Sequence, residues 1–213
     1  MLSKYSNQQQ PDIIVNTQNR CPKTADYWEQ RQLSSIATFN PKGTLPENFE
    51  YVDLESVVGT SLVSHRAERR KTAPSRAQRL AQKGDIFYQT VRPYQKNNYL
   101  FSLTADNYVF STGYAQLRPK IDNYFLFSCL QEEHFVSEVL DRSTGTSYPA
   151  INSKDLGKIH VSIPISLSEQ QEIGSMFLTL DRAIALHQRS WLKPTVNKNR
   201  DILTKMVFVC VYK

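Results

Sequence analysis

The chain has 213 residues, of which 40% are hydrophobic and 22% charged, a balance typical of a folded protein with one good core. No apolar run approaches the roughly 20 residues needed to span a bilayer, and the N-terminus lacks the apolar core of a secretion signal. Three cysteines far apart in the sequence predict neither a disulfide framework nor a zinc knuckle. We therefore expect a cytoplasmic protein without a membrane partner.

The excess positive charge lies in one stretch. The whole chain carries 26 Lys and Arg against 20 Asp and Glu, and residues 64–83 hold seven of the cations but only one anion, Glu68. The remainder therefore has 19 residues of each sign (26 less 7, and 20 less 1). The seven cations are Arg66, Arg69, Arg70, Lys71, Arg76, Arg79 and Lys83. Such a concentration indicates a polyanionic partner, because binding releases the polyanion's condensed counterions. A solvated basic loop is the alternative interpretation.

The expected elements follow a polar, Gln- and Asn-rich tail at residues 1–20, which has little to bury. Ordered sequence is expected from Tyr27 and Trp28 onward. Gly59 is expected to open the basic loop, and a turn at 83–85 to end it. Alternating apolar residues predict strands at 51–54, 86–88, 108–110, 115–117 and 159–164.

Two helices are expected in the second half of the chain. Apolar residues at 124–140 roughly follow one helical face, which predicts a single helix, and a Ser/Thr/Gly loop follows at 141–149. The other helix is expected to begin at Ser168, because Ser168-Glu-Gln-Gln171 has the pattern of a capping box. A globular domain is thus predicted at residues 21–165, followed by a helical spacer or dimerisation region at 166–213.

The second predicted helix carries the spacing of a coiled-coil seam. Its large side chains recur at steps of three and four residues, at Ile173, Phe177, Leu180, Ile184, His187 and Trp191. An ordinary amphipathic helix packed on its own domain is the alternative. Pro194 removes a backbone donor and clashes with the preceding turn, so we expect the helix to kink there.

Sequence motifs for catalysis are absent. There is no P-loop, no G-x-G-x-x-G fingerprint and no Pro-Pro turn of the amino-methyltransferase type. The four histidines lack metal-ligand spacing. Glu132-Glu133-His134 and the Ser/Thr-rich residues 143–147 offer no nucleophile with a partner base. We predict no catalytic residues, no metal site and no cofactor.

Several pieces of the chain resemble, in the same order, the specificity subunit of type I restriction–modification systems. They are Trp28–Leu33, Tyr51–Ser56, Ala73–Arg79 with Lys83–Ile86 and Thr90–Pro93, Ser111–Pro119, Ser143–Ile151, Lys154–Leu156, and Ile163–Ile173 leading to Leu180 and Arg189. Each piece alone is weak, and Ala73–Pro93 is the most specific of them. Their joint order and spacing cover about one half of such a subunit.

This resemblance implies an α+β target-recognition domain with a small mixed sheet, joined to the long coiled-coil-type helix that the family shares. In the family, two such units stand in tandem, their helices pair antiparallel, and each domain recognises one half of a bipartite sequence in double-stranded DNA. Methyltransferase subunits dock on the assembly and supply S-adenosylmethionine, and a restriction motor subunit joins indirectly. Because only one unit is present here, a homodimer is a further partner to consider.

The resemblance also assigns candidate residues. Phosphate contacts are expected from Arg66, Arg69, Arg70 and Lys71, and Arg79 is a further DNA-binding candidate. Base contacts are expected from Arg76, Arg92, Thr112, Thr144, Thr146 and Tyr148. For Arg76 and Arg92, tying loops to carboxylates is an equal alternative. The partner helix is expected to use Ile173, Phe177, Leu180, Ile184 and Trp191.

Two other functional classes remain open. A single-chain enzyme acting on DNA is one, and the missing catalytic motifs argue against it. The other is a decayed or stand-alone DNA-binding or interaction module, with no role in restriction and modification.

Overall fold

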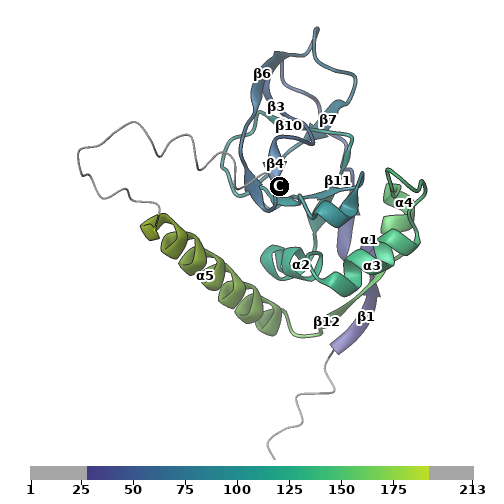
Figure 1. The fold of residues 1–213 in the computed structure, drawn as a ribbon, viewed down its shortest axis with the longest axis vertical. Coiled ribbons are helices and arrows are strands. Elements are labelled where there is room, and N and C mark those ends of the chain that lie inside the picture. The colour runs from purple at the N-terminus through teal and green to yellow at the C-terminus, as the bar shows by residue number, and fades with distance from the viewer. Residues whose placement is uncertain (1–27, 192–213) are drawn as a thin grey trace, which may run out of the picture.

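The computed structural model describes residues 28–191, with side chains up to residue 187 (Figure 1). The two ends of the globular body are joined by β1 (Trp28–Gln32) and β12 (His160–Pro164), which pair antiparallel with Gln32 opposite His160. The short helix α1 (Leu33–Ile36) leads from β1 into β2 (Ala37–Phe39). The body is therefore closed by contacts between residues more than 120 positions apart.

One four-stranded sheet has the order β6-β3-β10-β7. Its strands are β3 (Asn48–Val52), β6 (Arg66–Arg69), β7 (Ala77–Leu80) and β10 (Tyr108–Ser111). β3 and β10 run parallel, whereas the other pairs are antiparallel, so the expected mixed sheet is confirmed. A small hairpin of β4 (Val57–Val58) and β5 (Ser61–Leu62) lies between β3 and β6 in the chain.

The second four-stranded sheet has the order β2-β11-β8-β9 and is antiparallel throughout. Its remaining strands are β8 (Ile86–Gln89), β9 (Tyr99–Leu100) and β11 (Tyr114–Pro119), and the 3₁₀-helix η2 (Pro93–Gln95) separates β8 from β9. Only Thr112 and Gly113 separate β10 from β11, so this turn passes the chain from one sheet to the other. Phe87 and Phe110 stack with ring centroids 3.6 Å apart and join the two sheets in an aromatic cluster.

Four helices follow the second sheet in the chain, and the first two pack against it. They are α2 (Asn123–Cys129), α3 (Glu133–Asp141), α4 (Ser153–Leu156) and α5 (Leu167–Trp191). Side chains of α2 and α3, such as Phe125, Leu126 and Phe135, share the largest buried cluster with Tyr88 and Leu117 of the sheet. α5 packs against α2 and continues beyond it (Figure 1).

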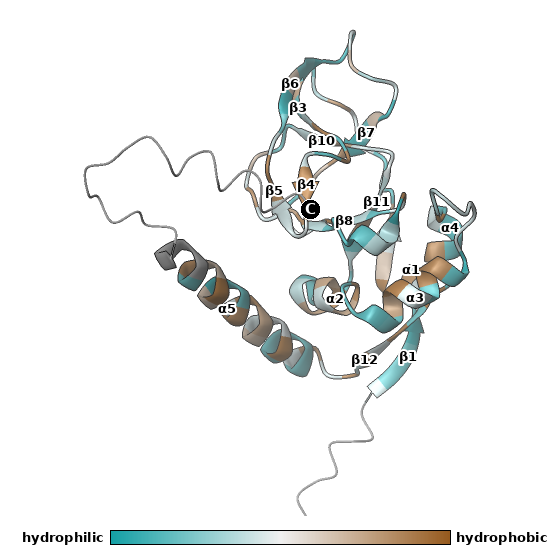
Figure 2. Cartoon of the chain, viewed as in Figure 1, coloured by the Kyte–Doolittle hydropathy of each residue, from teal (hydrophilic) through white to brown (hydrophobic). Residues whose placement is uncertain are grey.

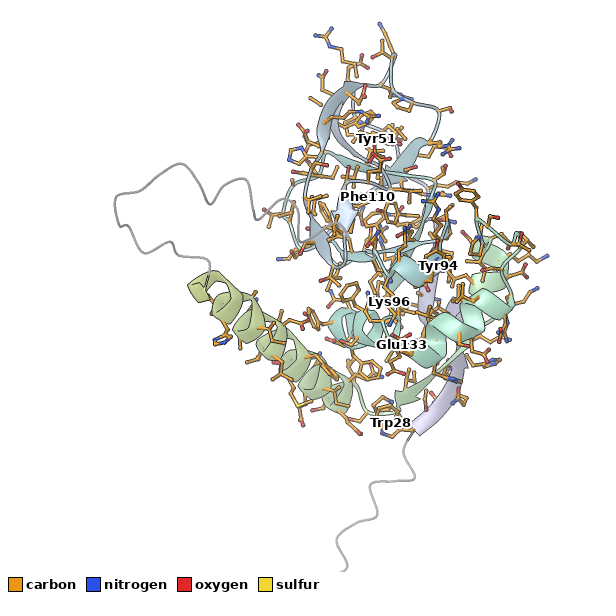
Figure 3. All side chains as sticks on the ribbon, in the orientation of Figure 1. Trp28, Tyr51, Tyr94, Lys96, Phe110 and Glu133 are labelled. Atoms are coloured by element: carbon orange, nitrogen blue, oxygen red, sulfur yellow. The ribbon has the colours of Figure 1, made fainter. Side chains whose placement is uncertain are left out.

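The prediction of a single helix over 124–140 was wrong. α2 ends at Cys129 and α3 begins at Glu133, after Glu132 has adopted an extended conformation. The Lys96 amino group lies between η2 and α3 (Figure 3) and donates to the Gln131 carbonyl at 2.9 Å. A distant side chain therefore occupies a carbonyl group that a continuous helix would have used.

Two further expectations are corrected. α5 begins at Leu167, and Ser166 rather than Ser168 accepts from the Glu169 amide, at 3.4 Å. Ser168 donates instead to Glu172. Part of the basic stretch expected as a loop forms β6 and β7, because pairing with β3 and β10 supplies partners for its backbone.

The N-terminal tail and the kink at Pro194 lie outside the described residues, and the division into domains stays a prediction. Within residues 28–191, no helix combines the length and the apolar character needed to cross a membrane.

Candidate nucleic-acid interface

Main-chain hydrogen bonds tie four loops into one continuous ridge. The Thr112 amide donates to the Arg76 carbonyl at 2.8 Å, and the Thr90 amide to the Gly113 carbonyl at 3.0 Å. The Arg92 amide donates to the Pro149 carbonyl at 2.8 Å. We call these loops, residues 69–76, 90–92, 111–113 and 144–150, the rim. The rim brings together most of the candidate DNA-binding residues from segments far apart in the sequence.

Four exposed cations of the rim have no carboxylate partner among residues 28–187. Arg69, Arg70, Lys71 and Arg76 are exposed. Arg69 ends β6, and Arg70 and Lys71 begin the turn that connects β6 to β7 at one end of the molecule, the top of Figure 1. The backbone of this turn is satisfied, since the Arg70 amide donates to the Glu47 carbonyl at 2.8 Å. The side chains are therefore held on an ordered support while their charges remain unneutralised.

Arg66 differs from these neighbours. Its guanidinium lies 2.9 Å from an Asp53 carboxylate oxygen and 2.8 Å from a Glu68 carboxylate oxygen, over the ring of Tyr51. The hydrogen bond that Arg66 donates to the Glu68 carboxylate raises the pKa of Arg66, and Asp53 adds to the effect. Arg66 therefore ties β6 to the end of β3, and two carboxylates offset its charge.

Arg79 is also outside the rim. It lies half-buried in β7, where burial lowers its pKa, and its Nε atom has no hydrogen-bond partner in the described part of the chain. Its position in the sheet makes it less accessible to a phosphate than the cations at the turn.

Arg92 and Tyr148 form the second prominent feature of the rim. The guanidinium carbon of Arg92 lies 4.4 Å from the centre of the Tyr148 ring, which remains 63% exposed. Arg92 has a φ of 55°, a left-handed conformation that is uncommon outside glycine and is enriched at functional sites. The structure thus favours a half-buried Arg92 stacked on an exposed ring over the alternative in which it ties a loop to a carboxylate.

The threonines complete the rim. Thr144 and Thr146 are exposed, and Thr112 is half-buried at the crossing between the sheets. Reciprocal hydrogen bonds between Thr144 and Ala150, both 2.9 Å, close the loop that presents Tyr148. Gly145 within it has a φ of 90°, which an L side chain rarely adopts.

A buried carboxylate supports the strands behind the rim. Asp85 is 1% exposed and accepts hydrogen bonds from Arg118 at 2.8 and 2.9 Å, from the Gln116 side chain at 2.7 Å and from the Gln82 amide at 2.9 Å. The hydrogen bonds that Arg118 donates to the Asp85 carboxylate raise the pKa of Arg118. Most of the hydrogen-bonding groups of Asp85 and Arg118 are therefore used within the fold.

One exposed aromatic of this region escaped sequence reasoning. Tyr94 of η2, two residues after Arg92, is 49% exposed (Figure 3). Pro93 favours the start of a helix, which could have indicated that Tyr94 lies in a short helix, but its exposure depends on the tertiary structure.

A second candidate surface lies at the other end of the molecule. A groove of about 900 Å³ runs between α2, α3, β12 and α5, and its apolar lining includes Phe127, Phe135, Met176 and Phe177. Cys129 lies in this groove, and burial raises the pKa of its thiol to about 12.

The predicted seam on α5 has two parts. Ile173 packs against the core cluster of its own domain, and Phe177 lines the groove, which agrees in part with the alternative of an ordinary amphipathic helix. Leu180 and Ile184 are 49% and 55% exposed, and Figure 2 shows apolar positions recurring along this helix. The side chain of Trp191 is not among those that the structure describes.

Comparisons with known proteins agree with this arrangement. Residues 25–191 match the model of the type I restriction modification DNA specificity domain. The chain is 26% identical over 169 residues to the HindI specificity subunit of Haemophilus influenzae, an alignment that covers 76% of this chain and 36% of the relative.

Two solved structures share the fold. The HsdS subunit from Thermoanaerobacter tengcongensis is 27% identical, with a TM-score of 0.63 over 77% of this chain and 44% of that one. A chain from a structure of complex assembly in a type I R-M system has a TM-score of 0.66 at 24% identity, over 76% and 44%. This chain therefore spans less than half the length of these relatives. It belongs to the family of type I restriction–modification DNA specificity domains, the non-catalytic specificity components of such systems.

Proposed function

We propose that the rim binds double-stranded DNA and recognises one half of a bipartite site. The observation that carries this proposal is the set of unpaired cations at Arg69, Arg70, Lys71 and Arg76, on loops fixed to one another through their backbones. Exposed cations without carboxylate partners bind phosphates at little cost, because no existing ion pair has to be broken.

The rim offers two kinds of contact. Arg69, Arg70 and Lys71 at the turn suit phosphates, which position a protein on DNA without specifying sequence. Arg76, Arg92, Thr112, Thr144, Thr146 and Tyr148 lie behind the turn and supply guanidinium, hydroxyl and methyl groups, which suit base edges. A positioning cluster beside a specifying cluster is the division of labour that sequence-specific binding requires.

Selection from a pool of random duplexes tests this function. The purified chain, alone and with a type I methyltransferase subunit, is expected to enrich a defined short motif. A matched protein with Arg76, Thr112 and Tyr148 replaced by Ala is expected to bind DNA without enriching that motif. Enrichment of no motif under either condition would reject sequence recognition and favour a stand-alone module.

The proposed role of α5 is to dock partner subunits. Met176, Leu180 and Ile184 recur at steps of four residues on one face of α5 and are about half exposed, and Met176 also lines the groove beside α3. An incoming helix on this stripe would bury apolar surface at both the helix and the groove. Methyltransferase subunits and a second copy of the chain are the partners we assign to it, with a restriction motor subunit attached indirectly.

Pairing of two copies through α5 would give an isologous coiled-coil contact and two rims related by twofold symmetry. The DNA site of such a dimer is an interrupted palindrome, because identical domains face in opposite directions. With few heptads available, weak pairing that DNA or a methyltransferase subunit strengthens is expected.

Sedimentation at high protein concentration tests the pairing. Leu180→Asp is expected to abolish association, whereas Ala185→Asp, on another face of α5, is expected to preserve it. A strict monomer in the presence of both DNA and a methyltransferase subunit would contradict the pairing. In the same preparations, the chain without its partner is expected to transfer no methyl group from S-adenosylmethionine to DNA.

A further inference from the structure

The contact between α5 and α2 depends on a glycine. Gly174 is buried, and a Cβ atom placed on it would lie 2.4 Å from an Asp122 carboxylate oxygen and 2.9 Å from the Phe125 amide nitrogen. That same carboxylate oxygen caps α2, because it accepts from the Phe125 amide at 2.8 Å. The backbone of α5 therefore touches the capped first turn of α2 at a distance that no other residue permits.

A buried side chain one turn earlier completes this contact. Gln170 is 4% exposed, and its amide nitrogen donates to the Pro164 carbonyl at 2.8 Å. Its amide oxygen accepts from the Asp122 backbone at 3.3 Å. One glutamine thus links the end of β12, the cap of α2 and the first turns of α5. We call Gly174, Asp122 and Gln170 the joint.

Contacts on both sides of the joint fix the direction of α5. Before it, the Trp28 indole donates to Glu169 at 3.2 Å and meets Phe125 edge to face. After it, the Tyr124 hydroxyl donates to Asp181. Attachment at positions 169, 170, 174 and 181 covers about three helical turns, which restricts tilt as well as sliding.

Beyond Asp181 the helix leaves the body, since the side chains of residues 182–187 are all exposed. The distance along the helix from Gly174 to Trp191 is roughly 26 Å at 1.5 Å per residue. A tilt of about 15° at the joint would move that end by roughly 7 Å, about two base-pair steps of DNA. The joint is therefore placed where a small local change has a large effect far away.

We infer that the joint sets the angle between the rim and α5, and so the number of base pairs between the two half-sites that a paired assembly recognises. The three residues are positioning residues and touch no DNA. The spacing part of this inference rests on the proposed function, whereas the angular part is independent of it.

The angle is measured by spin labels at Ala185 and Lys154, both exposed, in a chain whose native cysteines are replaced by Ser. Gly174→Ala is expected to shift or broaden the distance distribution between them. Ser175→Ala, an exposed neighbour on the same helix, is the matched control and should leave the distribution unchanged. Gln170→Ala provides the second variant if Gly174→Ala does not fold. A folded joint variant with an unaltered distribution overturns the inference.

The spacing is measured with duplexes that carry two copies of the selected half-site and a variable spacer. Joint variants are expected to shift the preferred spacer by about one or two base pairs, as the displacement above implies, with unchanged affinity for a single half-site. A shifted distance distribution with an unshifted spacer would overturn the spacing part. If the wild-type chain binds no half-site, the proposed function fails, while the label distances still decide the angular part.

Discussion

The rim and the joint lie in different parts of the body and are built in opposite ways. In the rim, the main chain makes the contacts between loops, and Arg70, Arg76 and Tyr148 keep their side chains for solvent. In the joint, the polar side chains of Gln170 and Asp122 make the contacts, and these internal hydrogen bonds occupy their polar atoms. The groups available to a ligand are therefore those that the fold itself does not use.

The same contrast separates charged residues within one sheet. Arg66 at the start of β6 is held by Asp53 and Glu68, whereas Arg69 at its end has no such partner within the described chain. Two arginines only three positions apart on one strand therefore have different roles: Arg66 is structural, and Arg69 is a candidate for DNA binding. Charged groups that are paired within the fold and charged groups that are free to bind a ligand should therefore respond differently to substitution.

The largest effect of a substitution is expected at Asp85, whose charge is paired inside the protein. Asp85→Ala removes the acceptor of Arg118, Gln116 and the Gln82 amide, and breaking such a buried network should lower the free energy of unfolding by about 3 kcal/mol. Urea denaturation measures it. Asp106→Ala, an exposed carboxylate, is the control and should leave the denaturation midpoint in place. An unchanged denaturation midpoint for Asp85→Ala would show that this buried, paired charge does not stabilise the fold.

A smaller effect, on binding alone, is expected at Tyr148. Tyr148→Ala removes the ring under Arg92 and should weaken specific DNA binding by about 1 kcal/mol, close to fivefold, with the free energy of unfolding unchanged. Tyr148→Phe keeps the ring and should retain most of the affinity. Equal losses in the two variants would show that the hydroxyl group, and not the stack, matters.

The two arginines of β6 and its turn are expected to differ in salt dependence. Arg70→Ala should flatten the slope of log affinity against log salt concentration by about 0.9, the value of one phosphate contact. Arg66→Ala should change the slope by less than half of that, because its charge is already offset by two carboxylates. Equal changes in a fluorescence titration would remove the distinction between paired and unpaired cations.

The smallest expected effect concerns Cys129 in the groove. Because burial raises the pKa of its thiol to about 12, almost no thiolate is present at pH 8, and iodoacetamide should modify it far more slowly than a cysteine in a short peptide. Mass spectrometry of the Cys129 peptide follows the rate. Modification as fast as in the peptide would contradict the burial.

Much of the fold follows from local patterns. Residues 51–52, 86–88, 108–110, 115–117 and 160–164 do lie in strands, and the long second helix forms, because their apolar spacing is strong. β1 and β6 were not expected, because their mostly polar residues show no apolar alternation and they form strands only by pairing with β12 and β3. The break between α2 and α3 was missed because Gln131 and Glu132 are good helix formers. The Lys96 side chain, distant in the sequence, binds the Gln131 carbonyl at this break.

The sequence identified the residues of the candidate interface, but it did not show which of them are exposed and unpaired. Charge alone singled out the stretch that contains Arg66, Arg70 and Arg79, yet it could not separate the paired and half-buried members from the free one. That separation depends on Asp53 and on the packing of β7, which are tertiary features. Whether each residue contacts DNA stays a prediction.

The salt dependence of DNA binding by a chain with Arg69, Arg70 and Lys71 replaced by Ala tests the central claim most directly. If these available cations contact phosphates, the slope should flatten by roughly 2 to 3, at about 0.9 per contact, and affinity should fall alike for all sequences. Arg182→Ala, an exposed cation on α5, is the control and should leave the slope in place. A slope in the triple variant equal to that of the wild-type chain would contradict the account.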